Sequence, residues 1–287
     1  MSKKIYRALL LCGVAAGLAG PAGGGAVSSL LRAPRSTPLS DLMDPVNEIA
    51  VDQDQEEVAY IFEKYHLISA PVVDAGGRLV GQITVDDIVN IIQEENREDI
   101  LRLAGVADED RGSSVPEIVR GRVPWLAINL ATAALGASVI GLFEATIQQI
   151  VALAVLMPIV ASMGGNAGTQ TMTVAVRALA SRDLDIYNAG RIVRREALIG
   201  LLNGIVFAVL IGIVASLWFE DIALGQVIAI AVVINMLAAA LAGILIPLVL
   251  DHFGADPAIS SGTFVTTVTD VVGFFAFLGL AAWWFAV

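Results

Sequence analysis

The residues of this chain that could hold an ion lie inside segments apolar enough to enter a membrane. The last such segment, 263–287, has 25 residues, enough to cross a hydrocarbon layer about 30 Å thick. Five polar or small residues share one helical face of it: Thr263, Thr266, Thr267, Asp270 and Gly273. A carboxylate at that depth costs at least about 2.5–3.5 kcal/mol unless it faces water or a partner. We therefore predict a helix that lines a water-filled path, with Asp270 as its charged group; the alternative is that Asp270 caps a shorter helix beginning at Val271.

A second polar stripe lies in the apolar run at about 145–172. Four side chains fall on one helical face, at spacings of four, four and three: Ser162, Asn166, Gln170 and Thr173. Three glycines offer places where another backbone can approach closely: Gly164, Gly165 and Gly168. Because amides and hydroxyls in lipid need partners, this face must meet protein or water. Contact between helices would by itself explain the stripe, so its meaning depends on the stripe around Asp270.

Together the two stripes offer one carboxylate and several neutral oxygens, and the apolar runs contain no Lys, Arg or His. Such groups suit a hard cation, preferably Mg²⁺ or Ca²⁺. Mg²⁺ gives up its water reluctantly, and one carboxylate per chain cannot build a dehydrated octahedral cage. A symmetric dimer could place two Asp270 carboxylates around an ion that keeps its waters. We therefore expect a homodimer that selects ions by hydrated size and charge.

The composition is that of a membrane protein with a small acidic module. The 287 residues are 56% hydrophobic, with a mean hydropathy of +0.77. The apolar runs are 124–143, about 145–172, 197–219, 222–250 and 263–287. Residues 41–110 hold 18 of the 28 acidic residues against four Lys or Arg, a balance of −14. We predict an α-helical membrane protein with five transmembrane helices behind a soluble α/β module, whose acidic surface repels nucleic acid and attracts cations.

The loop charges predict how the five spans are oriented. Arginines follow run two or precede run one: Arg177, Arg182, Arg191, Arg194, Arg195, Arg120 and Arg122. The loops after runs one and three contain acidic residues and no Lys or Arg: Glu144, Glu220 and Asp221. By the positive-inside rule the arginine-bearing sides and the acidic module are cytoplasmic. Five crossings of the inner (plasma) membrane then place the C-terminus outside.

The acidic module has the pattern of alternating strands and helices. We predict a strand at 46–51, and a helix at 54–66 whose apolar side holds Val58, Ile61, Phe62 and Tyr65. Two strands at 71–73 and 79–85, joined by an Asp-Ala-Gly-Gly turn, and a helix opened by Asp86 and Asp87 follow. This order, with the motif Gly81-Gln-Ile-Thr84-Val-Asp86-Asp87, resembles one CBS module. The resemblance implies that Thr84 and Asp87 could hold the ribose and phosphates of ATP or another adenine nucleotide.

The domain limits follow from these assignments. The module is expected at 37–90, a connecting helix and linker at 91–121, and the pore domain at 122–287. The acidic residues of 91–121 would otherwise be a solvated helix face. Residues 1–36 are an uncertain segment: Lys3, Lys4 and Arg7 before an apolar stretch have the form of a signal peptide. We favour a remnant or a misassigned start, because Pro21 and the glycines at 23–25 disfavour a spanning helix.

Four sequence stretches resemble the MgtE family of magnesium channels: PIVASMGGNAGTQT at 158–171, VRALASRDL at 176–184, DPAISSG at 256–262 and TDVVGFF at 269–275. The resemblance implies a homodimer with the pore between subunits, Asp270 as the central Mg²⁺ site and Asp256 as an accessory site at the cytoplasmic mouth. Runs two and five would line the pore, through Asn166, Gln170, Thr266, Thr267 and Gly273. Four acids would bind the regulatory Mg²⁺ that closes it: Asp87, Glu95, Glu98 and Asp99.

The sequence departs from the family pattern in its regulatory half. The N-terminal helical domain and the first CBS module of that pattern are missing, so we expect an N-terminally truncated member. His66 and Asn90 stand where aspartates are expected, and each exchange removes a carboxylate. We therefore predict that closure by cytosolic Mg²⁺ is weaker than in a complete member.

Other classes of function fit the sequence less well than a Mg²⁺ channel. The sequence shows no Ser/His/Asp set, no Cys/His metal cluster and no phosphate-binding glycine loop with a lysine, so we expect no enzyme. A broad divalent-cation transporter that accepts Co²⁺, Mn²⁺ or Ni²⁺ is the rival within transport. A membrane-anchored nucleotide sensor and an inactive truncated product are the others. An anchor has no use for a buried Asp270, which favours transport.

Overall fold

The computed structural model describes residues 47–106, 114–180 and 186–286, together with 33–34, 37–38 and 41. The chain divides into two compact units, Met1–Glu98 and Asp99–Val287. The expectation for the signal-like N-terminal segment lies outside the described residues, and so does most of the linker expected after the connecting helix.

The first unit is a small α/β module. Its sheet has the order β1 (Ile49–Ala50), β2 (Ser69–Val73) and β3 (Leu79–Thr84), with β1 parallel and β3 antiparallel to β2. Helix α3 (Gln55–Tyr65) joins the two parallel strands, and α4 (Val85–Leu103) follows β3. The predicted elements are therefore confirmed, although the described part of the first strand is shorter than expected because the chain turns at Val51.

The core of the module confirms most of the predicted apolar face of α3. Five side chains are buried together: Ile49, Val58, Phe62, Ala70 and Ile88. Tyr65 was expected on this face but is 52% exposed, because α3 ends there and His66 leaves the helix with a φ of 50°. At the other end Asp54 caps α3 by accepting from the Glu56 amide, at 2.9 Å.

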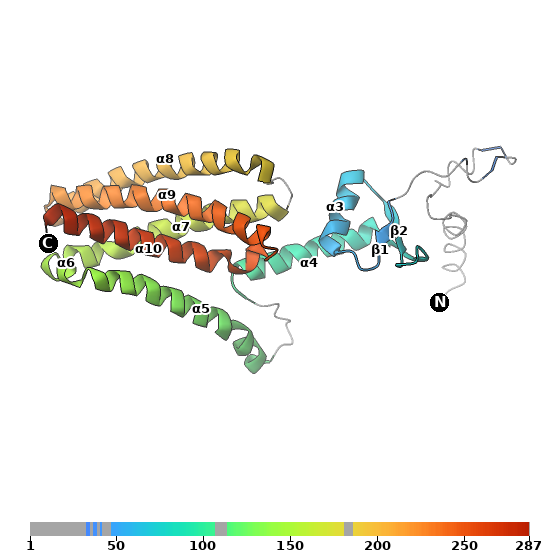
Figure 1. Ribbon diagram of the computed structural model, residues 1–287, viewed down its shortest axis with the longest axis horizontal. Coiled ribbons are helices and arrows are strands. Elements are labelled where there is room, and N and C mark those ends of the chain that lie inside the picture. Colours follow the sequence, from blue (N-terminus) through green and yellow to red (C-terminus); the bar gives the residue numbers. More distant parts are fainter. Residues whose placement is uncertain are drawn as a thin grey trace. The chain divides into compact units, whose positions relative to one another are not determined.

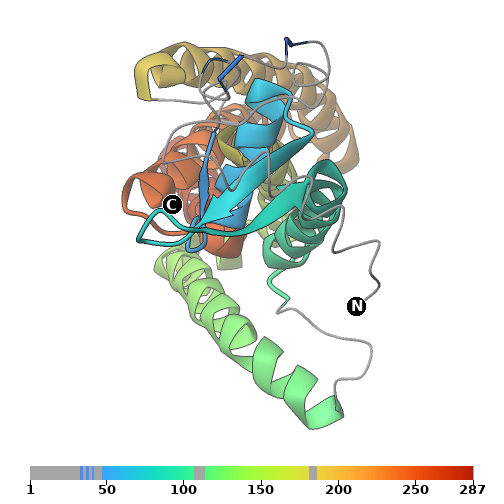
Figure 2. The ribbon, with the colours of Figure 1, turned by 90° about the vertical axis from the view of Figure 1, so that its right-hand side faces the viewer.

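The second unit is a bundle of long apolar helices. Its elements are α5 (Val115–Leu142), α6 (Glu144–Gln149), α7 (Ala152–Ala180), α8 (Ile186–Phe219), α9 (Ile222–His252) and α10 (Pro257–Phe285). All but α6 are long and apolar enough to cross a membrane, which agrees with the five predicted spans. Figures 1 and 2 show α8 and α5 on opposite sides of this unit, with α9 and α10 between them.

Three helix boundaries differ from the limits of the apolar runs. Helix α5 begins at Val115, nine residues before the run, because Ser114 and Glu117 form a capping box. The second run is not one helix, since α6 and α7 are separate helices with a break at Ile150 and Val151. Helix α10 runs unbroken through Asp270, so the alternative in which Asp270 caps a helix starting at Val271 is wrong.

Helix α9 occupies the centre of the bundle and packs against α7, α8 and α10. It is apolar all around, the pattern of a helix buried on every side. Helix α8 approaches it at paired glycines, where a methyl group added to Gly225 would lie 2.5 Å from the Gly212 carbonyl oxygen. Because helices in lipid gain little from hydrophobic burial, such close backbone contact is a main source of their association.

The glycine contact between α8 and α9 can be tested by adding one methyl group. In Gly225→Ala the new carbon meets the fixed backbone oxygen of Gly212, so the helices must separate, at a cost of about 1–3 kcal/mol. We expect the melting temperature of the detergent-solubilised protein to fall by several degrees. Gly141→Ala is the matched control, because nothing lies within 4 Å of its added methyl group. Equal melting temperatures for the two variants would contradict this account of the packing.

Candidate functional site

Asp270 lies midway along α10, on a face that α5 partly covers. A methyl group added to Gly136 of α5 would lie 3.7 Å from the Asp270 Cβ, in ordinary contact. Seven residues earlier on both helices, Thr263 Oγ1 donates a hydrogen bond to Asn129 Oδ1 at 2.8 Å. The two helices are therefore parallel and in register along this face. Asp270 is partly buried and is the only ionisable side chain within α10 after its N-cap.

The threonines before Asp270 present oxygens rather than protons. Thr266 Oγ1 donates to the carbonyl oxygens of Gly262 and Thr263, both at 3.0 Å, and Thr267 Oγ1 donates to Thr263 at 2.6 Å. Each hydroxyl proton is thus used inside the helix, and the oxygen lone pairs remain as acceptors. The water shell of a cation points its hydrogens outward. Acceptor oxygens beside a carboxylate are therefore the groups that a hydrated cation can bind.

The polar stripe of α7 is exposed in the single chain. All four members of the predicted face are exposed: Ser162, Asn166, Gln170 and Thr173. Asn166 Nδ2 donates to Ser162 Oγ at 3.3 Å. This stripe is not a contact between helices of the same chain, which was the simpler explanation. An exposed row of amides and hydroxyls in a membrane helix requires water or another chain.

The opposite side of α7 packs within the chain, at a residue that the sequence analysis missed. Gly164 and Gly168 are buried, whereas Gly165 has open space beside it. Asn235 of α9 is 1% exposed and donates from Nδ2 to the Val160 carbonyl oxygen at 2.8 Å. The sequence signal that could have identified Asn235 is an amide side chain in the middle of a largely apolar run.

Gly273 faces this amide rather than open space. A methyl group added at Gly273 would lie 2.6 Å from Asn235 Nδ2, and Gly273 itself is buried. The contact explains why only a glycine fits there. Its expected place in the lining of a pore stays a prediction.

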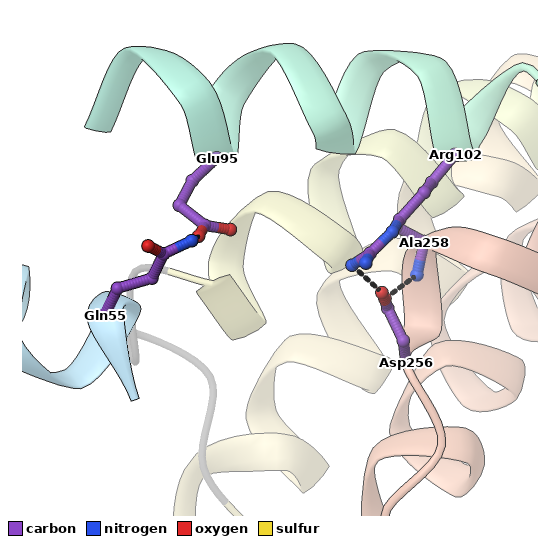
Figure 3. Close-up of polar contacts among 5 residues, drawn as sticks. All are labelled: Gln55, Glu95, Arg102, Asp256 and Ala258. Carbon is purple, nitrogen blue, oxygen red and sulfur yellow. Dashed lines mark hydrogen bonds and ion pairs between the residues drawn. The ribbon is translucent and has the colours of Figure 1, made fainter. Parts of the chain in front are cut away.

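Asp256 lies at the beginning of α10 and is already partnered. Its Oδ1 accepts from the Ala258 amide at 2.8 Å, which caps the helix, and its Oδ2 accepts from Arg102 Nη1 at 2.5 Å (Figure 3). Arg102 lies in the last turn of α4, and both side chains are about one-third exposed. The carboxylate that was expected to serve as an accessory ion site is therefore already paired with an arginine.

The expected regulatory acids of the first unit also have protein partners. Asp87 Oδ2 accepts from Thr84 N at 2.9 Å and from Thr84 Oγ1 at 2.8 Å, which caps α4. Both hydrogen bonds lower the pKa of Asp87, and the one from the Thr84 hydroxyl has the larger effect. Glu95 accepts a hydrogen bond from Gln55 Nε2 (Figure 3). Glu98, and Asp99 in the second unit, also have partners.

Within the described ranges, no three His, Cys, Asp or Glu side chains come together as a metal site would require. In the middle of α10 the membrane unit supplies one carboxylate, Asp270, with threonine hydroxyls before it. A site of this kind cannot strip a divalent ion of its water, but it can bind the water shell. The fold defines a helical membrane protein, and the groups around Asp270 have the chemistry that a hydrated cation could bind.

Comparison with known proteins agrees with this class. Residues 157–280 match the MgtE family, described as divalent cation transporters, and residues 39–94 match the CBS domain. The chain is 36% identical over 247 residues to the magnesium transporter MgtE of Enterococcus faecalis, which covers 86% of this chain and 54% of that protein. It is 35% identical over 263 residues to the magnesium transporter MgtE of Thermus thermophilus, covering 88% and 57%.

The magnesium transporter MgtE of Bacillus subtilis gives a similar match, 35% over 230 residues, covering 80% of this chain and 51% of that protein. This chain therefore belongs to the MgtE family, whose members are transporters. It spans about half the length of the curated relatives it matches.

The capping of α4 gives a pH-dependent prediction. Asp87 has a folded-state pKa below its usual range, so its stabilising effect is present above the unfolded pKa, about 3.9, and is lost as the pH falls through the folded value. We expect Asp87→Asn to melt at a lower temperature than the parent at pH 7 and the difference to shrink below about pH 4. Asp86→Asn, one position earlier, is the matched control. A difference that persists at low pH would contradict the role of the carboxylate.

Proposed function

We propose that this chain passes hydrated Mg²⁺ through a membrane pore at the interface of a homodimer. The observation that supports this most directly is the single carboxylate of Asp270 on a helix face of acceptor oxygens. A single carboxylate suits an ion that keeps its water and leaves quickly, because conduction requires binding strong enough for entry and weak enough for exit.

The proposed dimer is supported by polar side chains that a single chain leaves exposed on a membrane helix. The stripe of Ser162, Asn166, Gln170 and Thr173 is exposed although it lies on a membrane helix. Two copies related by a two-fold axis would enclose these stripes, together with the faces around Asp270, in one aqueous path. Two carboxylates would then face a doubly charged ion.

The proposed setting is the inner (plasma) membrane, with the CBS module in the cytoplasm and the C-terminus outside. The arginines that follow α7 support this orientation. The module and α4 supply acids whose mutual repulsion cytosolic Mg²⁺ would relieve, among them Asp87, Glu95, Glu98 and Asp99. Because several of these acids already have protein partners, we expect this closure to be weak. An adenine nucleotide is a second candidate ligand of the module, at Thr84 and Asp87. It would compete with the hydrogen bonds that Thr84 donates to Asp87.

Growth of a bacterial strain without Mg²⁺ uptake systems tests the proposed function. The parent chain should restore growth at low Mg²⁺, and Asp270→Ala at matched membrane expression should not, because the pore would lose its only charge. Asp251→Ala removes an exposed carboxylate at the end of α9 and is the matched control. Rescue by Asp270→Ala would exclude Asp270 as the essential pore site. Failure of the parent to restore growth, with the protein present in the membrane, would refute Mg²⁺ transport by this chain.

Competition by Co²⁺, Mn²⁺ and Ni²⁺ in the same strain separates a Mg²⁺ pore from a broad divalent transporter.

The ion pair at the start of α10 gives a second prediction. If Asp256 is an accessory ion site, Arg102 competes with the ion for its Oδ2. Arg102→Gln should therefore lower the Mg²⁺ concentration for half-maximal uptake into proteoliposomes by a few-fold, as a partly exposed pair is worth about 0–1 kcal/mol. Arg102→Lys keeps the charge and should behave as the parent does. An unchanged or higher half-maximal concentration in Arg102→Gln would count against an ion at Asp256.

A further inference from the structure

Asn235 is an amide side chain that is almost fully buried among the membrane helices. It is 1% exposed, and its Nδ2 donates to the Val160 carbonyl oxygen of α7 at 2.8 Å. Its Oδ1 accepts no hydrogen bond from any residue that the structure describes. An amide that is only half satisfied is costly in an apolar interior. A small apolar side chain would avoid that cost, so burial alone does not explain an asparagine here.

The amide lies between two glycines from two different helices. A methyl group added to Gly164 of α7 would lie 2.2 Å from Asn235 Nδ2, and one added to Gly273 of α10 would lie 2.6 Å from it. The corresponding distances to Asn235 Oδ1 are 2.9 and 3.2 Å. The amide is therefore pressed against the bare Cα atoms of both helices, and any other residue at either glycine position would displace it.

These contacts stand at the level of the polar groups proposed to line the pore. Gly273 is three residues, or about one helical turn, after Asp270. Gly164 is two residues before Asn166, so the two residues lie on different sides of α7. One side chain of α9 thus contacts both helices, by a hydrogen bond to α7 and by close packing against Gly273 of α10. In lipid, where apolar contacts give no preferred register, a directional hydrogen bond can set one.

We propose that Asn235 is a positioning residue for the cation path: its amide locks α7 to α10 and so sets the distance between the Asn166 stripe and Asp270. This inference rests on the proposed function. It assigns to α9, a helix without any predicted pore residue, control over how the chain discriminates between ions of similar charge. Mg²⁺ and Ca²⁺ differ in hydrated size and in how readily they lose water, so a shifted stripe changes their ratio.

Asn235→Leu tests the inference because leucine branches at Cγ as asparagine does and removes both polar atoms. The variant should remain folded and dimeric, with a melting temperature close to that of the parent. In proteoliposomes, its Mg²⁺ uptake and its preference for Mg²⁺ over Ca²⁺ should each fall roughly three- to tenfold, the range that one hydrogen bond between membrane helices is worth. Val232→Ala is the matched control. It removes buried volume one turn away on α9, so its stability should fall while its ion preference stays unchanged.

A second readout does not depend on ion flux. In a Cys12→Ser background, the thiol introduced by Asn166→Cys should react with a charged thiol reagent at a rate that Asn235→Leu changes and Val232→Ala does not. If Asn235→Leu does not fold, Gly164→Ala replaces it, because its methyl group displaces the amide from Val160.

The outcomes separate this inference from the proposed function. Unchanged ion preference together with unchanged thiol reactivity would overturn it, as would equal changes in Val232→Ala. In the remaining outcome the parent chain transports no Mg²⁺, but Asn235→Leu still changes the reactivity of the thiol introduced by Asn166→Cys. That result would refute the proposed function and support the positioning role of Asn235.

Discussion

The constraint on which this structure depends is that polar groups inside a membrane must find partners. Most of the chain meets it with helices, which satisfy their own backbones. Three threonines of α10, Thr266, Thr267 and Thr269, meet it by donating their protons to backbone oxygens, at 2.6–3.0 Å. Among the described residues, the polar groups that one chain leaves without a full set of partners include the exposed stripe of α7, the carboxylate of Asp270 and the Oδ1 of Asn235. Function is therefore sought in those places.

The helices are held together by shape more than by apolar attraction. Lipid tails are as apolar as leucine, so α9 associates with its neighbours through glycine contacts and one buried amide. The α8–α9 contact uses glycines on both helices. The α7–α9–α10 contact is different, because there the glycines make room for Asn235. The first arrangement brings backbones close, while the second also includes a hydrogen bond from a side chain to a backbone oxygen.

Sequence patterns predicted the parts of this structure that repeat with a simple period. The five spans and the strands of the module follow from hydropathy and spacing, and the family resemblance at 158–171 agrees with the matched region. Contacts between distant residues were out of reach. Nothing in the order of residues places Arg102 at Asp256, or Gly136 against Asp270, because such pairs depend on how helices pack. The break between α6 and α7 was missed because the run was assigned as one span, although α6 is a polar segment, EATIQQ.

The cap at the start of α10 also fixes the rotational phase of the whole helix. Asp256 and Pro257 define where the first turn begins, and Asp270 lies fourteen residues after the cap. Fourteen residues are close to four turns, about 21 Å, so both carboxylates belong to one side of the helix. Inserting or deleting a single residue between them would turn Asp270 by about 100° away from that side. Length variation should therefore be tolerated in the turn before Asp256, and the fourteen-residue interval after it should stay constant.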